Sequence, residues 1–250
     1  WTNANTIRRA DLDGTGDETL VTIGFNTLSG IALDAAAGKM YWCDQTAAKI
    51  QRANFDGSSV EDLITTGIGY PAGIALDIAA GKMYWTNGLL PKLMRANFDG
   101  TGVEDLVDAG VSSVPGWIAL DVTAGKMYWT ALELDGSFAI DGNRIKRANL
   151  DGSGIEALLS TGLNALSGIA LDVALPPTAN AGVDETICAG QGTTIRGSPT
   201  ASGGNGGPYE ITWSPATGLS STTEANPTAS PATTTTYTVT VTESSTGLSA

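Results

Sequence analysis

Three short motifs recur in a fixed order up to about residue 175, and this repetition constrains the fold more than any other feature. Arg-Ala-x-[Leu/Phe]-Asp-Gly begins at Arg9, Arg52, Arg95 and Arg147, so neighbouring copies start 43, 43 and 52 residues apart. Ile-Ala-Leu-Asp begins at Ile31, Ile74, Ile118 and Ile169, and Lys-Met-Tyr-Trp ends at Trp42, Trp85 and Trp129. A period of about 40 to 45 residues in strand-like units predicts the blades of a β-propeller.

Each repeat unit predicts four strands and no helix. In one copy, residues 30–34 are apolar and flanked by small residues, which is typical of an inner strand buried on both faces. Residues 39–42 carry aromatic side chains that suit a half-buried strand, and residues 49–55 alternate between apolar and polar side chains. Asp56-Gly57 is a hairpin turn signal, and residues 60–64 then form the most polar and outermost strand.

Gly-Ile-Ala-Leu-Asp, Met-Tyr-Trp and Ala-Asn-Phe-Asp-Gly, taken in that order, resemble the motifs of the low-density lipoprotein receptor class B repeat, or YWTD repeat. The resemblance covers residues 1–175 and implies a six-bladed propeller in an extracellular binding protein. The last Asp of the family motif matches Asp44, but Asn3, Asn87 and Ala131 stand at the corresponding positions. This variation favours a role in local hydrogen bonding between strands over chemistry at that position.

The repeat pattern begins and ends part-way through a blade. Trp1 enters the pattern at the second strand of a blade, and residues 169–173 end it at the first strand of a blade. One interpretation is that the two segments complete a single sheet and close a four-bladed ring without exposed edges. We favour about four repeats within a larger six-bladed array, as the resemblance implies. Because the chain begins within a motif and shows no signal sequence, we expect further repeats before it.

Composition changes after residue 175, which predicts a second domain. Residues 176–182 contain adjacent prolines and are expected to form a stiff linker between a propeller at 1–175 and a domain at 183–250. The β-prone runs of the second domain lie at 185–189, 193–196, 209–213 and 233–242. Several short strands within about 70 residues predict a small β-sandwich. The expected fold class of the whole chain is therefore all-β.

The second domain resembles the PKD-like, immunoglobulin-like domains of bacterial surface and secreted proteins. The resemblance rests on Thr-Ile-Cys-Ala-Gly at 186–190, Trp-Ser-Pro-Ala-Thr-Gly-Leu at 213–219, Asn-Pro at 226–227 and Thr-Thr-Tyr-Thr-Val-Thr-Val-Thr at 235–242. Domains of this type mostly act as spacers and stalks. The resemblance therefore implies a spacer or anchor and identifies no ligand.

The charged and titratable residues exclude several classes of function. With 13 basic and 26 acidic residues, the net charge of −13 repels phosphate backbones and anionic membranes, so we expect no nucleic-acid partner and no membrane insertion. The absence of His removes imidazole metal ligands and Ser-His-Asp triads. The pairs Glu61-Asp62 and Glu104-Asp105 fit a solvated outer strand better than an acid/base pair, because neighbours along a strand face opposite sides.

We therefore expect no enzyme activity, no cofactor and no metal. The only recurrent candidates for a metal site are the carboxylates of the Ile-Ala-Leu-Asp motifs, which could form a ring of ligands on the propeller axis. We favour a role of these carboxylates in hydrogen bonding at strand ends. The cysteines Cys43 and Cys188 are expected to be unpaired and shielded thiols. A disulfide between them would have to join the two domains and is the less favoured alternative.

Two departures from the repeat identify candidate ligand-binding residues. Trp117 stands where other copies have Gly30, Gly73 and Gly168, which places its indole near the central channel or against a neighbouring blade. Residues 131–143 contain an insertion, which predicts a longer hairpin with an Asp-Gly tip or a tolerated decoration. The candidate ligand contacts are Trp117, Leu134, Asp135, Phe138 and Asp141, with Ile140 as a further apolar contact.

The sequence as a whole predicts a non-enzymatic extracellular or cell-surface protein that binds a protein or glycan through a propeller scaffold. The second domain would serve as spacer or anchor. The alternative is a substrate-binding accessory region of a secreted hydrolase or lyase. A third interpretation, in which the propeller is itself an enzyme, needs acidic or amide side chains that converge at one mouth of the channel.

Overall fold

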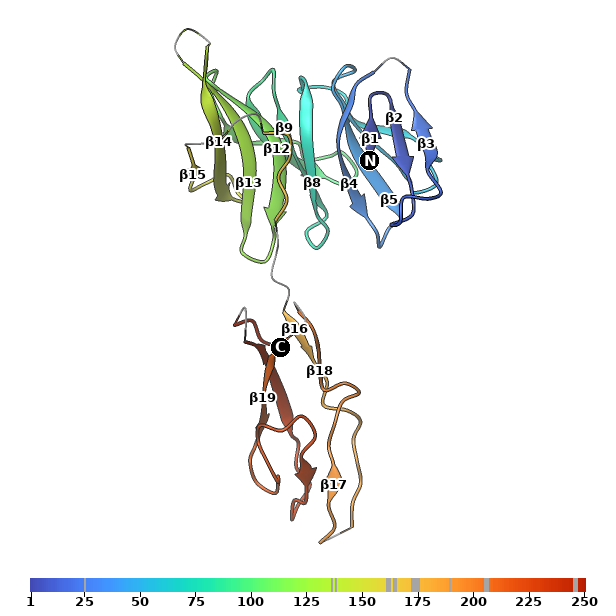
Figure 1. Cartoon of the computed structure of the whole chain (residues 1–250), viewed down its shortest axis with the longest axis vertical. Coiled ribbons are helices and arrows are strands. Elements are labelled where there is room, and N and C mark those ends of the chain that lie inside the picture. Colours follow the sequence, from blue (N-terminus) through green and yellow to red (C-terminus); the bar gives the residue numbers. More distant parts are fainter. Residues whose placement is uncertain are drawn as a thin grey trace. The chain divides into compact units, whose positions relative to one another are not determined.

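A computed structural model describes residues 1–24, 26–135, 137, 139–160, 163, 166–171, 176–188, 190–204, 207–244 and 247–250. These residues form strands, turns and irregular segments, and none of them lies in a helix. The described part therefore has no helix able to span a bilayer. The chain divides into two compact units, Trp1–Leu171 and Asp172–Ala250 (Figure 1).

The first unit consists of four antiparallel sheets that follow one another along the chain (Figure 1). The first sheet has three strands and the others have four, and each is built from consecutive strands as the repeat predicts. The strands are β1 (Thr2–Asn3), β2 (Thr6–Arg9), β3 (Glu18–Thr22), β4 (Leu28–Asp34), β5 (Lys39–Asp44), β6 (Lys49–Asn54), β7 (Glu61–Ile64), β8 (Pro71–Asp77), β9 (Lys82–Asn87), β10 (Lys92–Asn97), β11 (Glu104–Asp108), β12 (Ser113–Asp121), β13 (Lys126–Leu134), β14 (Ile140–Asn149) and β15 (Glu156–Leu159). Neighbouring four-stranded sheets meet through their first strands, β4 against β8 and β8 against β12, which is how propeller blades pack.

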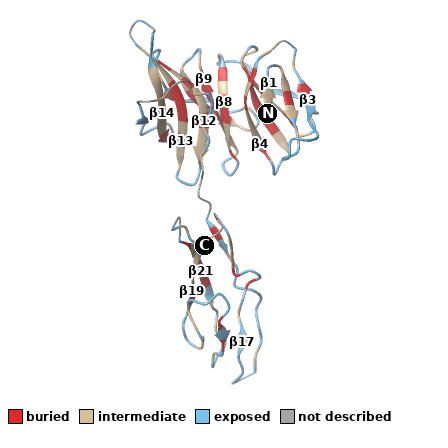
Figure 2. Cartoon of the chain, viewed as in Figure 1, coloured by how far each residue is buried: buried red, intermediate tan, exposed pale blue. Residues whose placement is uncertain are grey.

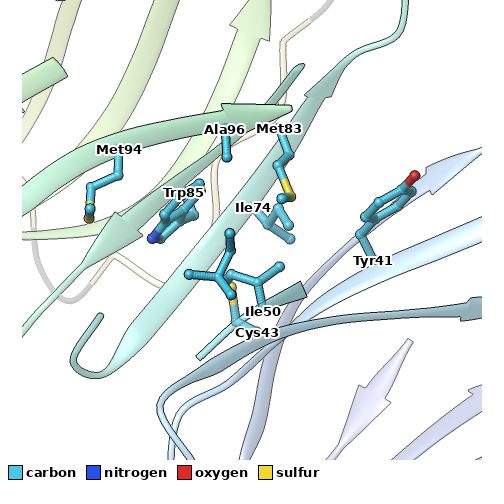
Figure 3. Close-up of a cluster of buried hydrophobic side chains, with 9 residues drawn as sticks. Tyr41, Cys43, Ile50, Ile74, Met83, Trp85, Met94 and Ala96 are labelled. Carbon is cyan, nitrogen blue, oxygen red and sulfur yellow. The ribbon is translucent and has the colours of Figure 1, made fainter. Parts of the chain in front are cut away.

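The hydrophobic cores lie between neighbouring blades. Figure 3 shows one of them, where Cys43 and Ile50 of one blade pack with Met83, Trp85 and Met94 of the next. A blade therefore buries its apolar faces only against a neighbour, so a single repeat of this length has no core of its own. Buried residues, coloured red on the cartoon in Figure 2, recur in successive blades.

The aromatic residues of the second strands lie at equivalent places in each full blade. The buried ones are Tyr41, Trp42, Tyr84, Trp85 and Trp129, so each Tyr-Trp pair contains at least one buried residue. In the strand register, each of these tryptophans lies opposite one residue of the third strand. The opposed pairs are Trp42 with Gln51, Trp85 with Met94 and Trp129 with Lys146. Trp42 Nε1 donates a hydrogen bond to Gln51 Oε1 at 3.1 Å, whereas the buried Trp85 Nε1 and Trp129 Nε1 have no acceptor among the described residues.

The inner strands approach each other most closely at the glycine that precedes Ile-Ala-Leu-Asp. A Cβ on Gly30 would lie 2.7 Å from Ala72 O and 3.0 Å from Gly73 Cα, and a Cβ on Gly73 would lie 2.9 Å from Trp117 Cα. Only glycine fits at such a distance from a neighbouring backbone. Trp117 holds the same position on β12, so its side chain prevents a further inner strand from approaching equally closely.

The inner strand predicted at residues 169–173 lies only partly within the described residues. Residues 166–171 contain no strand, and residues 172–175 lie outside the described part of the chain. Among the described strands, β1 is the edge of its sheet, so residues 166–171 do not complete that sheet as the less favoured four-bladed interpretation required. The six-bladed array stays a prediction.

The second unit contains three two-stranded antiparallel ladders, which pair β16 with β18, β17 with β20 and β19 with β21. These strands are β16 (Pro177–Ala179), β17 (Thr193–Thr194), β18 (Ala201–Gly203), β19 (Tyr209–Ser214), β20 (Thr228–Ala229) and β21 (Thr238–Glu243). Trp213, Val239 and Val241 form the buried core, and Trp213 Nε1 donates to Glu224 O at 3.0 Å. The unit is all-β, and its assignment as a β-sandwich stays a prediction.

Several local expectations for this region are corrected by the structure. Residues 177–179, expected within a linker, form β16, because the extended backbone that proline favours also suits a short edge strand. The run 185–189 forms no strand over 185–188, and its last residue lies outside the described part. The run 193–196 is a strand only at 193–194, and the run 233–242 becomes a strand only from Thr238.

Both cysteines are free thiols. Cys43 is fully buried, and this burial raises the pKa of its thiol far above the ordinary value. Cys188 is exposed, so the expectation that it is shielded is wrong. The segment around Cys188 forms no described strand that could bury it.

Candidate binding surface

One end of the blades gathers two kinds of connection, the turns between second and third strands and the segments that enter the first strands. Antiparallel pairing brings them together, because Pro71 at the start of β8 opposes Asn87 at the end of β9. In the next blade, Ser113 at the start of β12 opposes Glu133 near the end of β13. The candidate surface is built on these connections.

Large apolar side chains are exposed along these connections. They belong to Tyr70, Leu89, Leu90, Val111 and Ile140, which we call the apolar rim. The corresponding turn of the preceding blade carries Gln-Thr-Ala-Ala at 45–48 in place of Gly-Leu-Leu-Pro at 88–91. A regular repeat would thus place polar or small residues here, and the aliphatic pair is specific to one blade.

Backbone hydrogen bonds fix the loops of the apolar rim to one another. Gly88 N donates to Tyr70 O at 3.0 Å, and Leu134 N donates to Ser112 O at 2.8 Å. Tyr70 has a φ of 59°, a left-handed conformation that costs a residue with a side chain about 1–2 kcal/mol. Strain held by surrounding contacts is a feature that clusters at functional sites. The loops of the apolar rim therefore have a defined backbone conformation.

A small hollow of about 200 Å³ opens beside the apolar rim. Its lining residues include Tyr70, Val114, Thr130, Leu132 and Asn143. This volume is below the range of about 300–1,000 Å³ typical of small-molecule sites. It has room for one side chain of a partner and is too small for a cofactor.

A half-buried polar cluster supports the base of the hairpin that β13 and β14 form. Lys146 Nζ lies 2.7 Å from Glu133 Oε1, and Ser113 Oγ donates to the same oxygen at 2.7 Å. Burial by itself would raise the pKa of Glu133, but the hydrogen bonds from Lys146 and Ser113 lower it below the ordinary value. Lys146 thus neutralises the charge of Glu133, and the cluster holds the base of the hairpin in place.

The hairpin forms as the insertion predicts, since β13 and β14 both extend beyond the six residues of the strands equivalent to them. Leu134 is half-buried at its base, and Asp135 and Asp141 are exposed. Asp135 Oδ1 accepts hydrogen bonds from Ser137 N at 2.8 Å and Ala139 N at 3.0 Å, which closes the tip. Phe138 lies outside the described residues.

Trp117 is half-buried and lies away from the hairpin tip. Its backbone N donates to Thr130 Oγ1 at 2.9 Å, so it sits level with the middle of β13. Leu134 comes four residues after Thr130, which is roughly 13 Å further along an extended strand at about 3.3 Å per residue. The structure therefore brings Leu134, Asp135 and Asp141 together and leaves Trp117 on the inner strand.

The carboxylates considered as metal ligands accept hydrogen bonds from nearby backbone N atoms instead. Asp34, Asp77 and Asp121 each accept a hydrogen bond from a backbone N three residues later, at 2.9–3.0 Å. Asp44 accepts from Ala47 N at 2.8 Å, which agrees with the local bonding expected at the last position of the YWTD motif. Within the described ranges, no three acidic or cysteine side chains gather as a metal site would require.

Comparison with known proteins supports the propeller assignment. The family model of the low-density lipoprotein receptor repeat class B matches residues 38–78. The solved structure of a nidogen/laminin complex contains a chain that is similar with a TM-score of 0.58 and 27% identity, over 66% of this chain and 62% of that one. The present chain thus spans less than two thirds of that relative. A putative TolB from Agrobacterium tumefaciens gives a TM-score of 0.48 and 15% identity over 58% of this chain and 53% of that one. No curated protein sequence matches the chain.

The repeat match, the blade topology and the nidogen-like structure agree with one another. The first unit is accordingly an array of antiparallel blades in which residues 38–78 match the class B repeat model, and it is similar to a chain of the solved nidogen/laminin complex. Of the apolar rim, the sequence interpretation named Ile140 and missed the other four residues. A comparison of the turns at 45–48 and 88–91 would have identified Leu89 and Leu90, whereas the exposure of Tyr70 and Val111 depends on how the loops pack.

Proposed function

We propose that the first unit is a non-enzymatic binding module, extracellular or displayed at a cell surface, which holds a protein partner on the apolar rim and the adjoining hairpin. The exposed aliphatic side chains carry this proposal. They occupy rigid turns of two neighbouring blades, at positions where the preceding blade has polar or small residues. Contiguous exposed apolar side chains rimmed by polar groups are typical of protein interaction sites.

The chemistry of the rim favours a protein over a glycan. Leu89, Leu90, Val111 and Ile140 offer aliphatic surface, which gains free energy by burial against apolar side chains of a partner. The hollow beside Tyr70 accepts one such side chain. Asp135 adds negative charge at the edge, whereas Asp141 pairs with Arg144 at 3.4 Å, so a single basic side chain of the partner beside Asp135 suits the site.

The nidogen/laminin complex is consistent with this assignment, because there a similar propeller belongs to a protein–protein complex. The second unit, which we propose is a PKD-like sandwich, would act as spacer or anchor for the array. Its small core and short ladders provide a separate folded unit, and its described surface is rich in Thr and Ser.

A binding assay with surface-immobilised chain tests the proposal. The probes are a panel of extracellular matrix proteins that includes laminin, and a glycan array. The rim variant combines Leu89→Asp with Leu90→Asp, and Ile78→Asp is the matched control, because Ile78 is a similarly exposed aliphatic residue in the β8–β9 turn at the other end of the same blade. We expect the rim variant to bind its protein partner at least about tenfold more weakly, with the control unchanged.

Two further variants separate the predicted contacts. One replaces Trp117 with Gly, and the other shortens the 134–141 hairpin to the length of its neighbours. Equal binding by the native chain and the rim variant would remove the apolar rim from the site. Binding to polysaccharides alone would favour the accessory region of a hydrolase or lyase, and turnover of any substrate by the purified chain would overturn the assignment as a binding module.

A further inference from the structure

The inserted hairpin places an asparagine where the two preceding blades have an alanine and a proline. Asn143 comes directly before Arg-Ile-Lys-Arg of β14, and the equivalent residues, before Lys-Ile-Gln-Arg and Lys-Leu-Met-Arg, are Ala48 and Pro91. Asn143 is half-buried and lies opposite Leu132 of β13 in the strand register. It therefore introduces a polar side chain at a position that is apolar in both of those blades.

The side-chain amide of Asn143 has no hydrogen-bond partner among the described residues. The first blade has an asparagine at the same position, Asn5, and there Nδ2 donates to Gly24 O. Polar side chains shielded from water are normally hydrogen-bonded, and an amide has two N–H donors and an oxygen acceptor. Asn143 thus retains donors and an acceptor for a bound molecule.

This amide belongs to the wall of the hollow beside the apolar rim. Other residues of that wall include Tyr70, Val114 and Leu132, and Thr130 Oγ1 already accepts a hydrogen bond from Trp117 N. The described lining thus combines apolar side chains with one unpaired amide. A sugar would bury hydroxyls against the apolar side chains without partners, which costs free energy. A peptide suits the hollow, because an aliphatic side chain and the neighbouring main-chain amide have the two chemistries that it requires.

The main-chain groups of the bound segment must be free to pair with Asn143. In an α-helix the N–H and C=O groups bond to one another, so a helical segment has none to offer along its sides. An extended segment leaves these groups unpaired until a neighbour binds them. Asn143 Oδ1 can then accept from a main-chain N–H, while Nδ2 donates to a C=O. The hollow therefore favours an extended segment over a helix.

Asp135 adds a requirement for positive charge. Its Oδ1 accepts hydrogen bonds from Ser137 Oγ at 2.7 Å and Ser137 N at 2.8 Å, which lower its pKa and keep the carboxylate ionised near neutral pH. Asp135 lies three residues beyond Leu132, which is about 10 Å along an extended strand. Alternate residues of an extended peptide face the same side about 7 Å apart, and a Lys or Arg side chain covers the remaining distance. The basic residue is therefore expected two positions from the aliphatic one.

We propose that the apolar rim recognises an extended segment of its protein partner, with an aliphatic residue in the hollow and a Lys or Arg two positions away beside Asp135. This recognition rests on the binding function proposed above and specifies what the rim binds. Asn143 determines the specificity for an extended main chain, because it pairs with the peptide unit next to the aliphatic residue.

Selection from a phage-displayed library of random linear peptides on the immobilised chain tests the proposal. We expect the selected peptides to share an aliphatic residue with a Lys or Arg two positions away. Asn143→Leu removes the amide at nearly the same side-chain size and should weaken binding of a selected peptide at least about tenfold. Asn143→Gln keeps the amide and should restore part of the affinity. Asn5→Leu is the matched control, because it removes an amide at the same position of another blade, and it should bind like the native chain.

A change on the peptide separates a main-chain contact from a loss of local structure. Methylation of the backbone nitrogen beside the aliphatic residue removes the N–H that Asn143 Oδ1 accepts. It should weaken binding to the native chain about tenfold and have little further effect on binding to Asn143→Leu. A structural role of Asn143 alone would leave the effect of methylation the same for both chains.

The results for Asn143 and for the rim can be told apart. Peptides that bind Asn143→Leu and the native chain equally well, or equal effects of methylation on the two, would overturn the recognition of an extended segment. If no linear peptide is selected while a folded matrix protein binds and the Leu89→Asp, Leu90→Asp variant loses it, this recognition is wrong and the binding function of the rim stands. Selected peptides that bind that rim variant as well as the native chain would overturn both.

Discussion

Replacing Gly73 with Ala tests the close approach of the inner strands. The new Cβ would lie 2.7 Å from Ile118 N, 2.9 Å from Trp117 Cα and 3.0 Å from Gly116 O. All three are backbone atoms, so no change of rotamer relieves the overlap and two blades must separate. Overpacking a well-packed site costs about 1–3 kcal/mol, and we expect the upper part of that range. Because Ala reduces the freedom of the unfolded chain, about 0.4–1 kcal/mol is recovered. The net loss should be about 2 kcal/mol.

Gly168→Ala is the matched control, because Gly168 holds the same position in the fourth copy of the motif. Nothing lies within 4 Å of its Cβ position, so the substitution should be neutral or slightly stabilising. Guanidinium unfolding followed by tryptophan fluorescence reports the difference, since Trp213 alone of the six tryptophans lies in the second unit. Stabilities of the two variants that agree within about 0.5 kcal/mol would refute the close approach of the blades.

Other measurements address the cores, the thiols and the turns. Met94→Gln should raise the free energy of unfolding, measured by chemical denaturation, by about 1 kcal/mol. A Gln at this register gives the Trp85 indole the acceptor that Gln51 gives Trp42. A less stable variant would contradict this. Trp85→Ala should cost about 3–5 kcal/mol, and an unchanged melting temperature would argue against the blade core. A thiol reagent should modify Cys188 quickly and Cys43 only on unfolding; two fast thiols would contradict the burial of Cys43. Hydrogen bonds from the Thr101 hydroxyl and backbone lower the pKa of Asp99 below 3.8, so the turn's stabilisation is complete above pH 3.8 and is lost as pH falls through the lower folded-state pKa. Asp99→Asn should flatten this part of the dependence of melting temperature on pH, and an identical slope would exclude the turn as its source.

The repeated blade and its strands could be predicted from local sequence patterns. The three motifs placed inner strands at Ile31, Ile74 and Ile118, and aromatic second strands ending near Trp42, Trp85 and Trp129, close to where the structure has them. These features are local, because alternation along a strand and Asp-Gly turns depend on a few consecutive residues. The insertion likewise predicted the longer hairpin that carries Leu134, Asp135 and Asp141. The sequence predicted only the class of function, a binding protein, because the turns of a propeller carry little information about the ligand.

Tertiary structure decided which repeated residues have a partner. Ile169 belongs to the same motif as Ile31, yet residues 166–171 form no strand, because an inner strand forms by pairing with the second strand of its own blade and no described strand pairs with this segment. Leu12 and Phe98 hold equivalent positions in sequence, yet Leu12 is exposed whereas the Phe98 ring packs against the ring of Tyr41 in the preceding blade. The apolar rim arises in the same way, since the exposure of Tyr70 and Val111 depends on loops brought together by hydrogen bonds between segments distant in sequence. Burial is a property of what packs against a residue, and in a repeat protein identical sequence segments acquire different surroundings according to the blades beside them.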